Sequence, residues 1–257
     1  MTTTTRKTTK TPAKAHVRTE TLEQFNRELI EYGGYDPQFD VMVRDLFRVR
    51  AQKAQLTEAR KAIFEHVKTA HAIGHRVIPG TPYELKMTNP KPGELYKAVS
   101  SAQVKKVAPA AWKRAQAPAP FVQVKAPAAV AAAVPELDAP EAGEFMDPAT
   151  AAVTYKEHPA WSALKELRDE EADLLTRLDK VAAEFGWDGG AEDGPLVFAD
   201  AWSIQLKHTQ FSAEKLAELE PEVFESCAVL KQRAATPHVY VGKVGHHGED
   251  WDADWAE

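Results

Sequence analysis

The sequence contains one cysteine, and it has neither a long apolar run nor the short motifs of common catalytic sites. The single Cys227 excludes an intramolecular disulfide, so nothing in the sequence requires an oxidising compartment. No stretch approaches the roughly 18 apolar residues of a membrane span, and the first residues lack the apolar core of a signal peptide. These absences predict a cytoplasmic protein.

The motifs that hold phosphates or activate nucleophiles are also missing. There is no GxxxxGK[ST] loop, no GxGxxG after a strand and no GxSxG turn. His71 and His75 have the i, i+4 spacing that can hold zinc, but further ligands are lacking, so we expect a solvated or helix-terminal role for them. The segment GWDGGAEDG lacks the ligand pattern of a calcium loop and reads as a solvated turn. We expect no enzyme, no cofactor and no metal site.

The net charge of −6 conceals a division between the two halves of the chain. Residues 1–125 hold 22 Lys and Arg against 11 Asp and Glu, which gives +11. Residues 126–257 hold 10 against 27, which gives −17. Such a division predicts either different partners for the two halves or an attraction between the halves themselves.

Composition divides the chain into five segments. Residues 1–19 are rich in Thr and basic residues and cannot bury surface, so they are expected to form a disordered basic arm. Residues 126–157 are rich in Ala, Pro and Glu, which favours a semi-extended linker. The linker separates a basic unit, 20–125, from an acidic unit, 158–243, and an acidic tail with two tryptophans follows at 244–257.

Each unit shows the same order of expected elements. Apolar residues at helical spacing predict a long coiled-coil-like helix in each unit, and Glu171 takes one apolar place in the second. A hairpin is expected next, with RVI pairing with YELKM in the first unit and PLVF with WSIQL in the second. The stripes are Met42, Leu46, Val49, Leu56, Ile63, Val67 and Ala70, then Ala160, Leu164, Leu167, Leu174, Leu178, Val181 and Phe185.

A proline-containing helical segment and a short strand complete each unit. VKKVAPAAWKRA begins at Val104 and LAELEPEVFESC at Leu216, and their prolines, Pro109 and Pro221, are each followed three residues later by an aromatic residue. We expect each proline at a helix break or first turn, Ser212 as an N-cap, and Leu216, Leu219 and Phe224 in the core. FVQVK and VYVGK are the expected strands. The fold class is therefore α+β, with a unit of long helix, hairpin, helix and strand present twice.

These segments resemble an actinobacterial tailed-phage protein family of unassigned function. The resemblance is best over FSAEKLAELEPEVFESCAVLKQRAATPHVYVGK, residues 211–243, and weaker in the first unit. In element order alone, the chain is also distantly similar to the Gam-type host-nuclease inhibitors of phages, which are DNA-end-binding dimers. The resemblance implies a phage protein in the cytoplasm of an infected host.

Basic residues of the first unit are candidates for nucleic-acid contacts. Together with the N-terminal arm they could neutralise phosphates and give salt-sensitive, sequence-tolerant binding. The alternative is that they form the solvated faces of amphipathic helices. The candidates are Arg44, Arg48, Arg50, Lys105, Lys106, Lys113 and Arg114.

The tail is the candidate for protein contacts. Acidic residues would steer the approach to a partner, and the two indoles would anchor in a pocket, as in the acidic tails of bacterial single-strand-binding proteins. A tail that folds back on the basic half, or one that only solubilises, is also compatible with the sequence. The candidate residues are Asp250, Trp251, Asp252, Asp254 and Trp255.

Three functions follow from these observations. The favoured one is a non-enzymatic phage accessory protein that binds DNA, a DNA-processing complex, or both. The second is a structural or scaffolding protein that self-associates through its coiled-coil helices. The third is an acidic DNA mimic that inhibits a host enzyme or defence system through residues 126–257.

Overall fold

The chain has an α+β fold of long helices, short helices and small antiparallel sheets. The computed structural model describes residues 39–131, 133–192, 194–197 and 201–245. The elements follow in the order α2 (Phe39–Ala72), β1 (Tyr83–Met87), β2 (Leu95–Val99), α3 (Ser101–Val107), α4 (Pro109–Arg114), β3 (Gln116–Lys125), α5 (Ala128–Ala131), α6 (Pro148–Glu157), α7 (Ala160–Glu184), β4 (Leu196–Val197), β5 (Ser203–Phe211), α8 (Ala213–Leu219), α9 (Pro221–Cys227), β6 (Ala228–Gln232) and β7 (Val239–Lys243).

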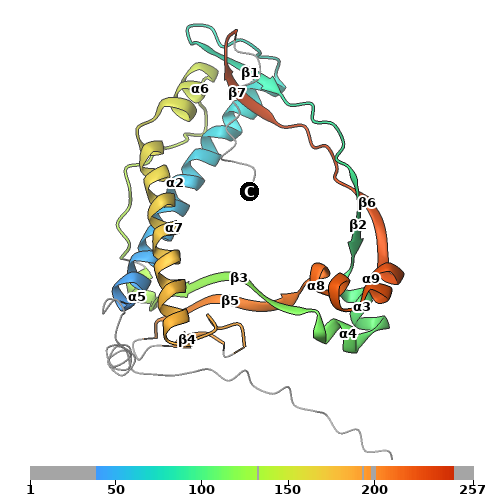
Figure 1. The fold of residues 1–257 in the computed structure, drawn as a ribbon. Helices are drawn as coiled ribbons and strands as arrows, with labels where there is room; N and C mark the ends of the chain where they lie inside the picture. The colour runs from blue at the N-terminus through green and yellow to red at the C-terminus, as the bar shows by residue number, and fades with distance from the viewer. Residues whose placement is uncertain (1–38, 132, 193, 198–200, 246–257) are drawn as a thin grey trace, which may run out of the picture.

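The two expected long helices form and pack against each other. Helix α2 has 34 residues and α7 has 25, and all seven stripe residues predicted in α2 are buried. In α7 the central leucines and Val181 are buried, whereas Ala160 and Phe185 at the ends of the stripe are only partly buried. The first half of the α2 stripe therefore packs on the α7 stripe within one chain (Figure 1), and the second half is buried against α6, β1 and β7.

Part of the expected linker is a packed helix. Asp147 caps α6, since its carboxylate accepts hydrogen bonds from the backbone N–H groups of Ala149 and Thr150, both at 3.0 Å. Ala151, Ala152 and Tyr155 of α6 are buried against α2. The prediction of an unpacked linker is wrong for these residues, because Ala151, Ala152 and Tyr155 form a small apolar helix face that composition alone did not reveal.

Each sheet pairs a strand from before residue 126 with a strand from after it. β1 pairs with β7, and Leu85 lies opposite Val241; β2 pairs with β6, and Ala98 lies opposite Val229. The third sheet has the order β3-β5-β4, and all of these pairings are antiparallel. The two halves of the chain are therefore joined by backbone hydrogen bonds along most of their strands.

The hairpin predictions have different outcomes in the two halves. The second hairpin is confirmed by β4 and β5, where Leu196 lies opposite Ile204. The first is confirmed over a short stretch, where Val77 bridges Glu84, the N–H of Leu85 donates to the carbonyl of Arg76 at 2.7 Å and the N–H of Ile78 donates to the carbonyl of Tyr83 at 3.0 Å. The main partner of β1, however, is β7, which the sequence did not predict. The strand VYVGK is confirmed as β7, and FVQVK is the end of the longer β3. The sequence reading missed β2 and β6, whose apolar residues are largely exposed.

The two proline-containing segments adopt the same backbone path. Pro109 starts α4 and Pro221 starts α9, as expected for residues that lack an N–H and fit the first turn. Ser212 caps α8 by accepting from the N–H of Lys215 at 3.1 Å, which confirms that prediction. Leu216 and Cys227 are buried, but Leu219 is 51% exposed, so its assignment to the core is wrong.

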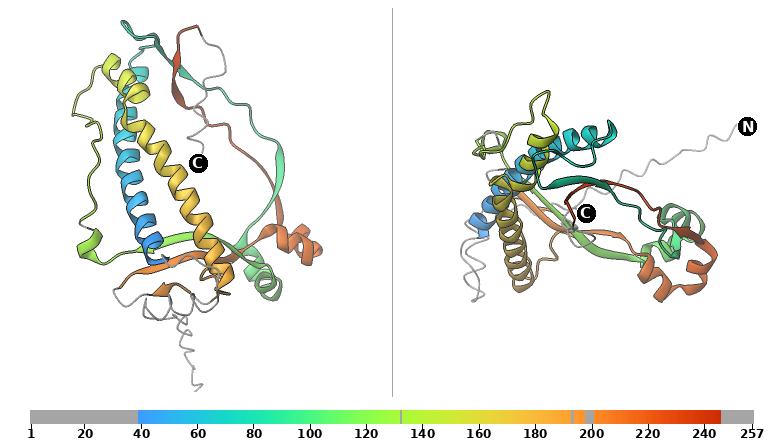
Figure 2. Two further views of the ribbon diagram at one scale, coloured as in Figure 1. Left: turned by 60° about the vertical axis from the view of Figure 1, so that its left-hand side comes forward. Right: turned by 90° about the horizontal axis from the view of Figure 1, so that it is seen from above.

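The buried hydrophobic residues of the described chain form three clusters, which lie at the corners of a triangular ring (Figure 1). The first cluster joins the start of α2 to α7 and β5, and the second joins the end of α2 to α6, β1 and β7. The third lies among α3, α4, α8 and α9, the corner helices, at the end of the molecule away from the long helices (Figure 2). The α2–α7 pair and the strand ribbons form the sides of the ring.

Candidate nucleic-acid interface

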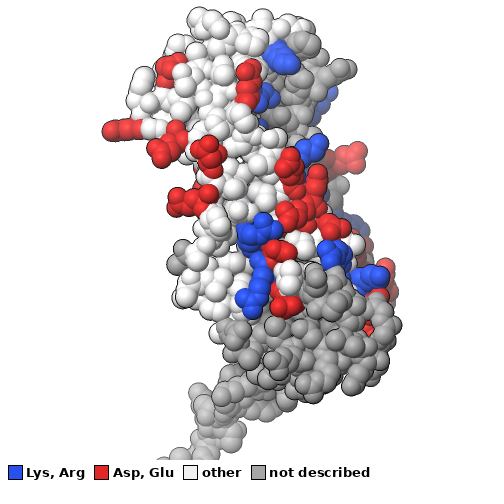
Figure 3. Space-filling view, turned by 90° about the vertical axis from the view of Figure 1, so that its left-hand side faces the viewer, with Lys and Arg blue, Asp and Glu red and all other residues white. Residues whose placement is uncertain are grey.

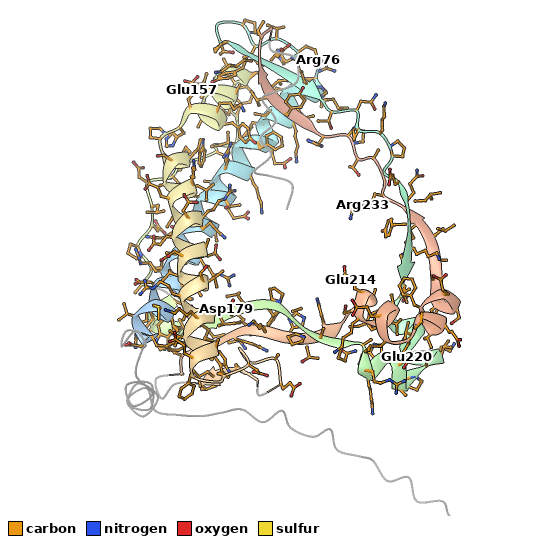
Figure 4. All side chains as sticks on the ribbon, viewed as in Figure 1. Arg76, Glu157, Asp179, Glu214, Glu220 and Arg233 are labelled. Carbon is orange, nitrogen blue, oxygen red and sulfur yellow. The ribbon has the colours of Figure 1, made fainter. Side chains whose placement is uncertain are left out.

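No helix or strand of the described residues crosses the centre of the ring, and the side formed by β2 and β6 is exposed to solvent on both faces. Every residue of β2 and β6 is exposed or half-buried, and in β3 only Ala119 is buried. A filled centre would bury one face of each ribbon and produce alternating burial. With all described side chains drawn, the space between the α2–α7 pair and the β2–β6 ribbon stays clear (Figure 4).

An aromatic ring and two basic side chains gather on one face of the β2–β6 ribbon. Tyr96 lies opposite Lys231 in the register, and the guanidinium of Arg233 lies 6.0 Å from the centre of the Tyr96 ring. Residues opposite each other in neighbouring strands share a face, so Lys231 lies on the same side as Tyr96. Arg233, one residue after the end of β6, is placed on this side by its contact with the Tyr96 ring. Figure 4 shows Arg233 directed into the opening, so this face, the inner face of the β2–β6 ribbon, lines the ring.

The three arginine candidates on α2 are already engaged within the chain. Arg44 lies over the ring of Trp202 at 4.9 Å, and Arg48 forms ion pairs with Asp45 and Glu170. Arg50 donates to Glu171 at 2.6 Å and to the carbonyl of Val122 at 2.6 Å. These side chains hold α2 against α7, β3 and Trp202, which precedes β5, so phosphate binding would have to displace internal partners.

Glu171 is the residue that these contacts stabilise most directly. It takes an apolar place in the α7 stripe, and it is 7% exposed. Burial alone would raise its pKa, but hydrogen bonds from Lys53 and Arg50, together with their charges, hold the pKa below its ordinary value. The sequence marked Glu171 as the interruption of a stripe, but only the structure shows the two cations that face it.

The four other basic candidates lie together on α3 and α4, far from α2 in the ring. Arg114 pairs with Glu220 through its Nε at 2.9 Å, and Lys105 lies over the ring of Trp112 at 4.7 Å. Lys106 and Lys113 are exposed. The structure therefore does not bring the seven candidates into one patch. Lys231 and Arg233, which the sequence reading missed, come from the acidic half and are recognisable only from the strand register.

Several basic side chains of the first half form ion pairs with acidic side chains of the second half. Besides the pairs of Arg48, Arg50 and Arg114, Lys97 of the basic half donates to Glu225 of the acidic half at 2.6 Å. These contacts support the predicted attraction between halves. On the face shown in Figure 3, acidic and basic side chains lie side by side instead of forming one field of a single sign.

The remaining predicted sites are placed as follows. His71 lies in the last turn of α2, which confirms the helix-terminal alternative, but it is buried and not solvated, and burial and the charge of Arg76 lower its pKa. In the described part of the chain, no three His, Cys, Asp or Glu side chains come together as metal ligands would. The basic arm at 1–19 and the tail candidates Asp250, Trp251, Asp252, Asp254 and Trp255 lie outside the described residues.

Comparisons with protein-family models, with curated proteins and with solved structures give no match for this chain. The similarity to tailed-phage and Gam-type proteins therefore remains a prediction from the sequence. Within residues 39–131, 133–192, 194–197 and 201–245, no helix combines the length and the apolarity that crossing a membrane needs.

Proposed function

We propose that the chain is an internal duplication whose two halves pair like the subunits of a two-fold dimer. Ala108 before Pro109 has φ −136° and ψ 70°, and Glu220 before Pro221 has φ −141° and ψ 63°. The strand before each helix pair bonds to the strand after the other: β2 with β6, and β5 with β3. This reciprocal pairing is the pattern that a two-fold axis through the α2–α7 pair and the corner helices would generate.

On this basis, the protein is a non-enzymatic accessory protein that binds DNA threaded through the ring. The observation that carries the proposal is the open ring with Tyr96, Lys231 and Arg233 on the inner face of the β2–β6 ribbon. Helix α2 is about 50 Å long and β3 about 33 Å, from their residue counts and standard rises. Sides of this length can frame a nucleic acid.

The chemistry of the inner face favours backbone contacts over base reading. Lys231 and Arg233 offer charged donors to phosphate oxygens, and Tyr96 offers a ring that can stack on an exposed base or sugar. The acidic Glu214 lies at the inner edge of the corner helices (Figure 4), where it would repel phosphates. Binding should therefore be sequence-tolerant and modest, and it should weaken as salt releases the contacts.

The test compares linear duplex DNA with a covalently closed circle of the same sequence, using fluorescence anisotropy or gel shift. A ring that threads DNA requires an end, so linear DNA should bind and the closed circle should compete at least tenfold less well. Lys231→Ala with Arg233→Ala should weaken binding about tenfold, and Lys106→Ala with Lys113→Ala serves as the outer-surface control. Equal affinity for the closed circle, or a greater loss in the control, would reject threading.

The structure gives less support to the two alternative functions, self-association through coiled-coil helices and inhibition by an acidic mimic. Self-association through coiled-coil helices would need the apolar stripes of α2 and α7, and these are already buried within the chain. An acidic mimic formed by residues 126–257 alone loses the partners of β5, β6 and β7. Contact with a DNA-processing protein of an infected host remains compatible with the exposed acidic residues of α8 and α9. Affinity capture from infected cells, with and without nuclease, separates that role from DNA bridging.

A further inference from the structure

The corner helices present one surface twice, with opposite charge. In α3 and α4, residues 101–114 contain four basic residues and no acidic ones; in α8 and α9, residues 213–227 contain five glutamates and one lysine. Lys106 and Glu218 hold equivalent places, three residues before Pro109 and Pro221, and both are exposed. Two copies of one local fold thus differ mainly in the sign of their charge.

Each copy also exposes one large apolar side chain beside its charge. Val107 is 64% exposed and Leu219 is 51% exposed, whereas Val104 and Leu216, three residues earlier in each copy, are fully buried in the shared cluster. In each helix pair, one side therefore faces the common core. The side chain one helical turn later, Val107 or Leu219, faces the solvent. A small apolar centre with a charged rim is the arrangement of a transient protein interface.

We propose that these two surfaces bind each other between molecules, so that the basic α3–α4 surface of one copy contacts the acidic α8–α9 surface of the next. Val107 would pack against Leu219 of the neighbour, with Lys106 near the neighbour's Glu218. Charge complementarity selects a second copy as the occupant. Apart from the internal pairs of Arg114 with Glu220 and of Lys97 with Glu225, the basic surface exposes Lys106 and Lys113 and the acidic surface exposes Glu218 and Glu222. Two basic surfaces, or two acidic ones, would repel each other.

The geometry makes this association head-to-tail. α3 packs on α9 and α4 packs on α8 around one cluster, so the two outward surfaces lie on opposite sides of the corner. A contact between two different surfaces is heterologous, and such contacts extend into open chains unless the rotation closes them. The small area predicts weak association that is strengthened by concentration and lost in high salt. This inference is independent of DNA binding, since it concerns the outer surface.

The experiment is sedimentation velocity on nuclease-treated full-length protein over a concentration series at low and high salt. The wild type should show a weight-average mass that rises with concentration at low salt and returns to that of the monomer at high salt. Lys106→Glu and Glu218→Lys should each weaken association about tenfold, because each places like charges in contact. Lys61→Glu, an exposed charge reversal on α2, is the control and should have no effect.

The decisive step is to mix the two single variants. The variant Lys106→Glu has acidic residues at positions 106 and 218, and the variant Glu218→Lys has basic residues at both. Neither variant should therefore bind a second copy of itself, but each should bind the other. An equimolar mixture, like the double swap in one chain, should restore association. A wild type that stays monomeric at all concentrations, or variants that neither the mixture nor the double swap rescues, would overturn the proposal. Circular dichroism of each variant checks that the fold is retained.

Discussion

Lys53 and Glu171 lie at the same position of the two long helices, each four residues after an apolar stripe residue, and they form an ion pair with each other. Arg50 completes the contact from α2 by bonding to the same carboxylate at 2.6 Å. A homodimer would place two lysines or two glutamates here, and the like charges would repel. In a single chain the two places can carry opposite charges, and this pair favours packing of α2 on α7 within the chain.

The first prediction concerns this contact. Glu171→Gln removes the charge that Lys53 and Arg50 share and should lower the free energy of unfolding by about 1 to 3 kcal/mol, measured by urea denaturation. Glu170→Gln is the matched control, since its pair with Arg48 is exposed and should contribute under about 1 kcal/mol. Equal losses in the two variants would show that burial of Glu171 has no energetic consequence.

The lowered pKa of Glu171 adds a pH dependence. A carboxylate whose folded pKa lies below its ordinary value of 4.5 stabilises the fold above that value, and this contribution is lost as pH falls through the folded pKa. The difference in unfolding free energy between wild type and Glu171→Gln should therefore shrink as pH falls below 4.5. A difference that stays constant down to pH 3 would contradict this reading.

His71 should make the stability of the fold depend on pH for a second reason, because the fold favours its neutral form, whereas it favours the charged form of Glu171. Burial and the charge of Arg76 lower its pKa below the ordinary 6.5, so the neutral form is favoured in the fold. Stability should be complete above pH 6.5 and should fall as the unfolded state takes up a proton below it. Thermal melts of wild type and His71→Gln between pH 7.5 and 5 should diverge least at the acidic end, and parallel curves would argue against the effect.

The corner helices provide a pair of leucines for comparison. Leu216→Ala empties a fully buried place in the third cluster and should cost about 2 to 5 kcal/mol of unfolding free energy. Leu219→Ala, three residues away on the same helix, should cost under about 0.5 kcal/mol, because its side chain is half exposed. Comparable costs at the two positions would mean that Leu219 is buried in solution.

The interleaved sheets predict that neither half folds alone. Residues 126–257 would expose β5, β6 and β7 without their main partners β3, β2 and β1, and two-stranded ribbons are marginal even when paired. We expect this fragment to show little cooperative unfolding by circular dichroism, and we expect mixing with residues 1–125 to restore it. A fragment that unfolds cooperatively by itself would contradict the pairing and would revive the acidic mimic.

The sequence by itself determined those helices whose apolar spacing or whose proline positions indicate helical structure. The stripes from Met42 and from Leu164 identified both long helices, and Pro109 and Pro221 marked helix starts because proline lacks the donor that a first turn does not need. The charge division also predicted ion pairs between the halves, such as that of Lys97 with Glu225. It could not show that Leu219 is exposed, because an amphipathic pattern does not reveal which turn lies at the edge of a cluster.

The tertiary structure alone decided which strands pair and what the pairing encloses. The strand Tyr83 to Met87 pairs over a short stretch with the adjacent RVI, as predicted, but nothing local shows that its main partner is Val239 to Lys243. Strand pairing is set by contacts between residues far apart in the chain. The order of the elements along the sequence does not show which of them lie side by side in space. For the same reason Tyr96, Lys231 and Arg233, which come from opposite halves, form one face only after the ring has closed.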